Sequence, residues 1–145
     1  MVLLAAIVLS INCFAQTDTT TKKDSTDDMV FTVAQKPAEF SGGINGWNRY
    51  LEQNLNIGLG NTYIVVPKGQ TQTTATVVLS FVVNKKGKVL DVTAQSTIPE
   101  NVHPELIKEA IRMLKNCPKW IPAKHNGTLV NYRHIQSISW QIFEE

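Results

Sequence analysis

Hydrophobic and polar residues alternate most clearly in the middle of the chain. The stretch TATVVLSFVVNKKGKVLDVTAQS holds two β-rich runs, Ala75 to Val83 and Val89 to Ser96, on either side of NKKGK. Gly87 can adopt the positive φ that a hairpin turn demands, so the two runs predict an antiparallel hairpin. The first run is apolar on both faces, which is typical of a strand with neighbours on both sides. The second run alternates, which predicts one covered and one exposed face.

Two amphipathic helices are predicted around this hairpin. Before it, a Gly-Gly turn leads into apolar residues at helical spacing: Ile44, Trp47, Leu51 and Leu55. After it, Pro104 stands at a first helical position and Pro118 ends the helix. The stripe that should face the core comprises Leu106, Ile107, Ala110, Ile111 and Leu114. The residues expected to face away are Lys108, Glu109, Arg112 and Lys115.

The remaining segments have a weaker pattern. From Ile57 to Thr74 the sequence predicts irregular chain, in which YIVVP is either a short strand or a loop. The last β-rich run extends from Val130 to Phe143. Its even-numbered positions are apolar at both ends and polar in the middle, which predicts a bulge or a change of facing near His134 to Ser137.

The order of these elements predicts an α+β fold. Helix, strand, strand, helix and strand would form two helices packed on one face of a three-stranded antiparallel or mixed sheet. A right-handed crossover returns the last strand beside the first and parallel to the second, which gives the order second, first, third. The last strand then lies at an edge of the sheet.

The N-terminal residues predict an exported protein. Residues 1–15, MVLLAAIVLSINCFA, are too short to span a bilayer comfortably but match the apolar region and small-residue end of a cleavable signal peptide, with Gln16 as the mature terminus. Cleavage removes Cys13; lipidation of Cys13 is the alternative, disfavoured by Asn12 before it. Residues 16–30 are polar and Thr-rich and predict a flexible tether. Residues 31–145 are left for the folded domain.

Composition and motif spacing exclude several classes of function. A net charge of +2, with 43% hydrophobic and 18% charged residues, is ordinary for a soluble domain and gives no indication of a nucleic-acid partner. No pair among His103, His125 and His134 has metal-ligand spacing, and no nucleophile-elbow motif is present. Cys117 follows an apolar stripe, which favours a small buried hydrophobe over a nucleophile. We therefore expect no metal, no cofactor and no enzymatic activity.

Several ordered motifs resemble one known family. VAQKPAEFSGG, the hairpin, VHPELIKEAIRMLKNCPKWIPAKHNGTLV and the closing strand are similar to the C-terminal domain of TonB, in the form common among Bacteroidetes, from about Val33 to Phe143. The resemblance implies that PKWIP links the second helix to the last strand. It also implies that Trp120 packs there against helix and sheet.

The resemblance further implies a non-catalytic periplasmic module that binds an extended peptide or protein, such as a segment of an outer-membrane transporter, by adding it as a strand to the last strand. The implied contact residues are Asn131, Tyr132, Arg133, His134, Gln136, Ser137 and Ser139. Association with the outer membrane and participation in energy transduction are left open.

Other readings of the last strand are also left open. The N-terminal segment can cover it, or it can pair with itself in a homodimer of a structural or assembly protein. A small metal-binding or hydrolytic protein is the remaining alternative.

Overall fold

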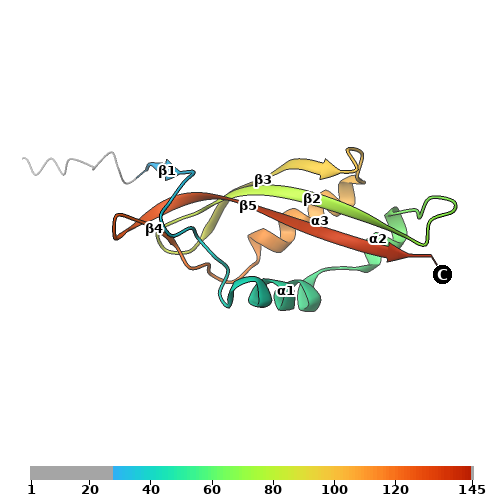
Figure 1. Cartoon of the computed structure of the whole chain (residues 1–145), viewed down its shortest axis with the longest axis horizontal. Helices are drawn as coiled ribbons and strands as arrows, with labels where there is room; N and C mark the ends of the chain where they lie inside the picture. Colours follow the sequence, from blue (N-terminus) through green and yellow to red (C-terminus); the bar gives the residue numbers. More distant parts are fainter. Residues whose placement is uncertain (1–27, 145) are drawn as a thin grey trace, which may run out of the picture.

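One twisted sheet carries all the helices of the described chain on a single face (Figure 1). A computed structural model describes residues 28–144. The elements run β1 (Val30–Phe31), α1 (Gly43–Asn54), α2 (Gly58–Tyr63), β2 (Gln72–Val83), β3 (Val89–Ile98), α3 (Pro104–Lys115), β4 (Ala123–His125) and β5 (Thr128–Phe143).

The sheet has the order β1-β5-β2-β3, and β4 pairs with the start of β5. β2 is antiparallel to both long neighbours, while β1 pairs parallel to β5. The α+β class is therefore confirmed, and the three long strands lie in the expected order. The expected count of two helices and three strands was too low, because α2, β1 and β4 are short elements without a clear sequence pattern.

The β2–β3 hairpin depends on its turn residues. Gly87 has φ 79°, and a side chain there would collide with the backbone of Trp120. The side chain of Asn84 accepts hydrogen bonds from the N–H groups of Lys86 and Lys88, both at 2.9 Å. The sequence motif NKKGK thus fixes the turn and docks it against the segment that follows α3.

β3 departs from the clean alternation that its sequence predicts. Its pairing with β2 shifts register between Val78 and Leu79 and again between Ser80 and Val82. Asp91 lies in the left-handed region with φ 51°. Such bulges bend a strand and re-aim its side chains. Leu90, an apolar residue of this strand, is accordingly exposed.

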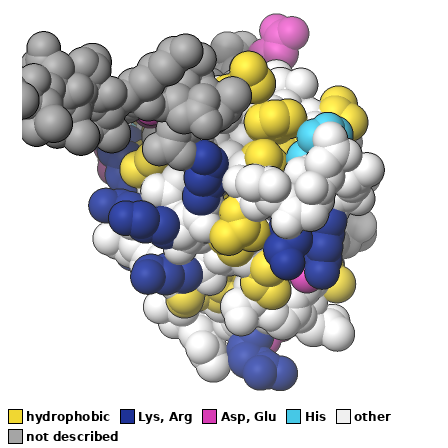
Figure 2. Space-filling model, turned by 90° about the vertical axis from the view of Figure 1, so that its left-hand side faces the viewer, with side chains coloured by type: hydrophobic (Ala, Val, Ile, Leu, Met, Phe, Trp, Pro, Cys, Tyr) yellow, Lys and Arg dark blue, Asp and Glu magenta, His cyan; other side chains and the backbone are white. Residues whose placement is uncertain are grey.

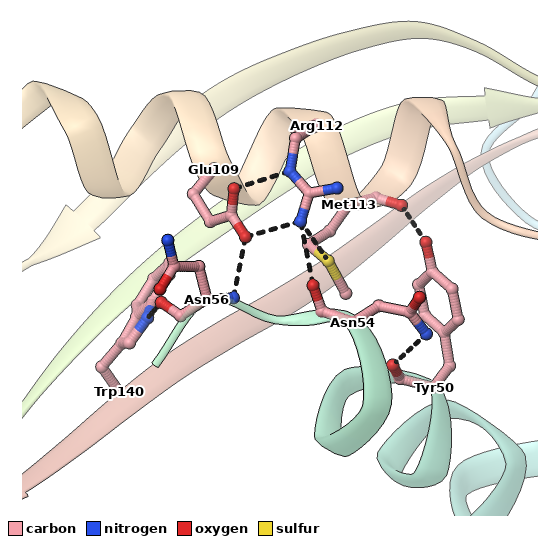
Figure 3. A network of polar contacts seen from close by, with 7 residues as sticks. All are labelled: Tyr50, Asn54, Asn56, Glu109, Arg112, Met113 and Trp140. Atoms are coloured by element: carbon pink, nitrogen blue, oxygen red, sulfur yellow. Dashed lines mark hydrogen bonds and ion pairs between the residues drawn. The ribbon is translucent and has the colours of Figure 1, made fainter. Parts of the chain in front are cut away.

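α3 begins at Pro104 as predicted and ends at Lys115, three residues before Pro118. The His103 side chain forms its N-cap by accepting the N–H of Glu105 at 3.3 Å. The expectation that Glu109 faces away from the core was wrong, since Glu109 is only 8% exposed. Figure 3 shows the reason. The Glu109 carboxylate accepts two hydrogen bonds from the Arg112 guanidinium, both at 2.7 Å, and one from the N–H of Asn56 at 2.9 Å. Its partners therefore replace the water that burial removes.

The same network ties the α1–α2 linker to α3 and β5. Arg112 also donates to the carbonyl of Asn54, and the indole of Trp140 donates to the carbonyl of Asn56. The Arg112 hydrogen bonds hold the pKa of Glu109 below its usual range. An ionised Glu109 thus stabilises the position of the chain beside β5.

α2 is a helix where an irregular segment was expected. Gly60 permits its close packing on β5, because a Cβ there would meet the side chains of Ile142 and Trp140. In α1, Trp47 is buried as expected, whereas Ile44 is 67% exposed and lies off the buried stripe. The YIVVP segment is a loop after its first residue, since α2 ends at Tyr63.

Trp120 is the centre of an aromatic cluster, which confirms its expected anchoring role. It is 4% exposed, and its ring centroid lies 5.1 Å from that of Phe81 and 5.5 Å from that of Phe40. Its indole N–H donates to Cys117 Sγ at 3.3 Å. Burial raises the pKa of the Cys117 thiol, so this sulfur stays protonated and packs as a small half-buried side chain.

The predicted signal peptide, residues 1–15, and most of the predicted tether, residues 16–30, lie outside the described residues. Val30, the last tether residue, already belongs to β1. Among residues 28–144, no helix has the length and apolar character needed to cross a membrane.

Candidate functional site

β5 presents an edge that the described chain covers only in part. On one side it pairs with β2 from Tyr132 to Phe143. On the other side β1 pairs only with Asn131 and Tyr132. From Arg133 to Phe143, no strand within residues 28–144 pairs with this second side. We call this stretch the open edge.

The direction of the backbone groups on the open edge follows from one hydrogen bond. Glu144 donates its N–H to the carbonyl of Thr71 at 2.9 Å, and the register continues without a shift from there to Val83 and Tyr132. In an antiparallel pair, residues alternate between facing the partner strand and facing away. Even-numbered residues of β5 therefore bond to β2. The odd-numbered residues direct their N–H and C=O groups to the open edge.

The bulge expected near His134 to Ser137 is absent from this continuous register. The polar even-numbered residues remain on the inner face, where His134 packs against aromatic rings. His134 is half-buried, with its ring centroid 5.0 Å from Trp120 and 5.4 Å from Phe81. This burial lowers the pKa of His134 below its ordinary value, so the imidazole is neutral at pH 7. A neutral ring can pack among aromatic residues without desolvating a charge.

Three of the residues implied as contacts lie on the outer face of the open edge. Arg133 donates to the Ser80 hydroxyl at 3.3 Å, and the hydroxyls of Ser139 and Thr76 are 2.8 Å apart. Ser137 is exposed. Since all three are odd-numbered, their main-chain groups face the open edge while their side chains lie over the sheet.

Asn131 and Tyr132 have a different setting. Both pair with β1, and the Asn131 side chain accepts the N–H of Lys85 at 3.2 Å. The N-terminal segment of the chain thus covers this part of the strand. The structure therefore brings Arg133, Ser137 and Ser139 together along the open edge and places Asn131 and Tyr132 at its closed end.

A small hollow lies between the inner face of β5 and the start of α1. Its volume is about 160 Å³. The residues that define it are Phe40, Ile44, Trp47, Trp120, His134 and Gln136. Sequence reasoning identified His134 and Gln136 but missed the wall from Phe40 to Trp47. No sequence signal marked this wall, because the helical spacing predicted that Ile44 would be buried together with Trp47.

The described histidines do not form a metal site. His103 caps α3, His125 ends β4 with its ring against Phe31, and His134 belongs to the aromatic cluster. No group of three or more His, Cys, Asp or Glu side chains within residues 28–144 is arranged to hold a metal ion. The geometry of the open edge offers main-chain hydrogen bonds and an apolar hollow, which are features of peptide recognition.

The sequence matches one protein family, described as Gram-negative bacterial TonB protein C-terminal, over residues 70–142. The match begins just before β2 and ends one residue before the end of β5. None of the curated proteins with which the sequence was compared matches it.

Proposed function

The chain belongs to the family of Gram-negative bacterial TonB protein C-terminal domains, and on this premise we propose that it is a non-catalytic envelope module that holds an extended peptide as an added strand on β5. The observation that carries the proposal is the open edge, Arg133 to Phe143, which is regular and has no strand partner within the described chain. An edge of this kind is a template for a further strand.

Main-chain hydrogen bonds would provide most of the affinity. The odd-numbered residues of the open edge offer N–H and C=O groups at every second position, and an extended peptide carries the matching groups. Binding by this route needs no particular sequence in the partner. It needs a segment of some five or six residues that is free to extend, roughly the length of an ordinary strand.

Selectivity would come from the two faces of the added strand. Alternate side chains of the peptide lie on the inner side, next to the hollow that His134 and Gln136 border. The others lie on the outer side beside Arg133, Ser137 and Ser139. Ile135, which is 56% exposed, lies between Arg133 and Ser137 on that outer side. We therefore assign an apolar inner contact and a mixed, mainly polar, outer contact to the bound strand. β1 limits its reach, because Asn131 and Tyr132 are already paired.

The partner that this family suggests is an exposed segment of an outer-membrane transporter in the periplasm. Export by residues 1–15 is part of the same proposal.

Photo-crosslinking in cells tests this proposal. A photoreactive amino acid is placed in turn at Ile135, Ser137 and Ser139 on the open edge, and at Gln95 on β3 as the matched control on the opposite edge. We expect adducts from the three β5 positions to a single extended segment of an outer-membrane protein. Moving the probe by two residues on β5 should move the attachment point by two residues on the partner, because a strand pair keeps register.

Two results would overturn the proposal. One is equal crosslinking from Gln95 and from the β5 positions. The other is a set of β5 adducts that join a second copy of this chain alone, which would favour a homodimer.

A further inference from the structure

Lysine side chains gather at the end of the molecule where the β2–β3 turn, β4 and β1 meet. We call this surface the lysine end; it comprises Lys36, Lys85, Lys86, Lys88, Lys115, Lys119 and Lys124. Figure 2 shows this end, with dark-blue side chains spread around it.

Contacts between the segments bring these lysines together. The N–H of Trp120 donates to the carbonyl of Gly87 at 2.9 Å, which joins the chain after α3 to the β2–β3 turn. Lys36 and Lys124 exchange two main-chain hydrogen bonds. A shallow hollow is bordered by Lys88, Lys115 and Lys119.

Three lysines of this surface present their side chains to solvent. Lys86, Lys88 and Lys119 are exposed. Within residues 28–144, α3 forms two ion pairs, Lys108 with Glu105 and Arg112 with Glu109. Neither pair includes a lysine of the lysine end. The lysine end thus concentrates positive charge on a chain whose overall charge is only +2.

The kind of basic residue indicates the kind of partner. Lysine predominates over arginine at this end. Arg49 and Arg112 lie on α1 and α3, and Arg133, which pairs with Val82 near the β2–β3 turn, already donates to the Ser80 hydroxyl. Arginine forms forked contacts to individual carboxylates or phosphates, whereas lysine is a compact point charge suited to diffuse attraction. A surface built mainly from lysine therefore fits an extended anionic surface better than a single acidic side chain.

Apolar side chains lie exposed among these lysines. Met29 is 52% exposed and Leu129 38%, whereas Ile121, which is 42% exposed, pairs with the exposed Glu39. Met29 and Leu129 border one hollow together with Lys85, and yellow side chains stand between the blue ones in Figure 2. Exposed apolar residues among lysines are typical of proteins that rest on membrane surfaces.

We propose that the lysine end docks on a phospholipid bilayer that contains anionic lipid. The lysines would lie over the phosphate groups, and Met29 and Leu129 would enter the headgroup region. β5 starts at this end and extends to the opposite one, so most of the open edge stays clear of the membrane (Figure 1). Docking would hold the module near a membrane without occupying its peptide-binding strand.

Vesicle binding tests this proposal. The protein, as recovered from a Gram-negative host, is mixed with vesicles of phosphatidylcholine alone or with one quarter phosphatidylglycerol, and bound protein is measured by sedimentation. We expect binding to the anionic vesicles that weakens as salt is raised, because salt screens exposed charges. The double variant Lys86→Gln/Lys119→Gln should bind about twenty-five-fold more weakly, since each lysine near an anionic surface contributes about fivefold.

The matched control is Arg49→Gln/Lys68→Gln, which removes the same charge from exposed positions outside the lysine end. We expect this variant to bind within about twofold of the unchanged protein, since its charges lie away from the docked surface. Equal weakening by both double variants would overturn the proposal, as would equal binding to neutral and anionic vesicles. Binding of poly-glutamate in preference to anionic vesicles would also overturn it, in favour of an acidic protein partner.

Discussion

The sheet has two long edges, β5 and β3, and they differ in regularity. The pairing of β5 with β2 runs without a shift from Gln72 and Phe143 to Val83 and Tyr132. The pairing of β3 with β2 shifts register twice, and Asp91, near the start of β3, adopts a left-handed backbone conformation. Bulges of this kind are one way in which proteins prevent an edge from pairing with other chains.

The two edge strands also differ in how deeply their side chains are buried in the core. β5 rests on fully buried residues, with Ile138 0% and Trp140 2% exposed, and has a hollow beside it. On β3, Leu90 and Ile98 are exposed, and no residue of the strand is fully buried. One edge is thus held straight by the core, and the other is irregular and shallow. Lack of a neighbouring strand therefore does not by itself make an edge a binding site.

The largest difference in stability between the two edges should come from shortening one inward-facing side chain on each edge strand. Ile138→Ala removes a fully buried side chain from β5 and should lower the free energy of unfolding by about 2–5 kcal/mol. Val92→Ala on β3 removes a half-buried one and should cost about 1 kcal/mol. Urea denaturation of both variants measures the difference. Equal losses would mean that the two edges are equally anchored.

The next largest effect on stability should come from Glu109, which holds the α1–α2 linker beside β5. Glu109→Gln should lower the free energy of unfolding at pH 7 by about 1–3 kcal/mol, because it removes charge-assisted hydrogen bonds to Arg112. Since the pKa of folded Glu109 is lowered, its contribution is complete above the ordinary glutamate value of 4.5 and is lost as pH falls through the lower folded value.

Urea denaturation of the Glu109→Gln variant at neutral and acid pH checks this prediction. The variant should lose less stability than the unchanged protein between neutral and acid pH. Exposed Glu52→Gln on α1 is the control and should behave like the unchanged protein. A Glu109→Gln variant with the full acid loss would contradict the assignment.

The smallest effect on stability should come from the open edge itself. Ser137→Pro removes an N–H that faces away from β2, so the fold should lose about 1 kcal/mol or less. Ile138→Pro, one residue further, removes a hydrogen bond to β2 and should destabilise the protein far more. Thermal unfolding compares the two variants. Ser137→Pro should also abolish crosslinking from Ser139, and retained crosslinking would contradict strand addition.

The elements that the sequence predicted well are those with a long pattern or a specific turn. The hairpin follows from two β-rich runs around Gly87, and α3 follows from Pro104 and an apolar stripe. By contrast, α2 contains two glycines in six residues, GLGNTY, and its position depends on contacts with Trp140 far along the chain. β1 is only two residues long, so no periodicity could reveal it.

The candidate site was predictable only along the strand that carries it. The resemblance pointed to residues from Asn131 to Ser139, and strand alternation separates their two faces. The strand sequence could not reveal that β1 covers Asn131 and Tyr132, or that α1 forms a wall opposite His134. Both contacts are made by segments distant in sequence. The burial of Glu109 was missed for the same reason, since Asn56 supplies one of its partners.

Amide hydrogen exchange on the isolated protein, resolved by NMR at a concentration where it is monomeric, tests the central claim most directly. If the edge is open, the N–H groups of Ile135, Ser137, Ser139 and Gln141 exchange rapidly, while those of Gln136, Ile138 and Trp140 exchange slowly because they bond to β2. Slow exchange at the odd-numbered as well as the even-numbered positions would contradict the account, because the edge would already be covered.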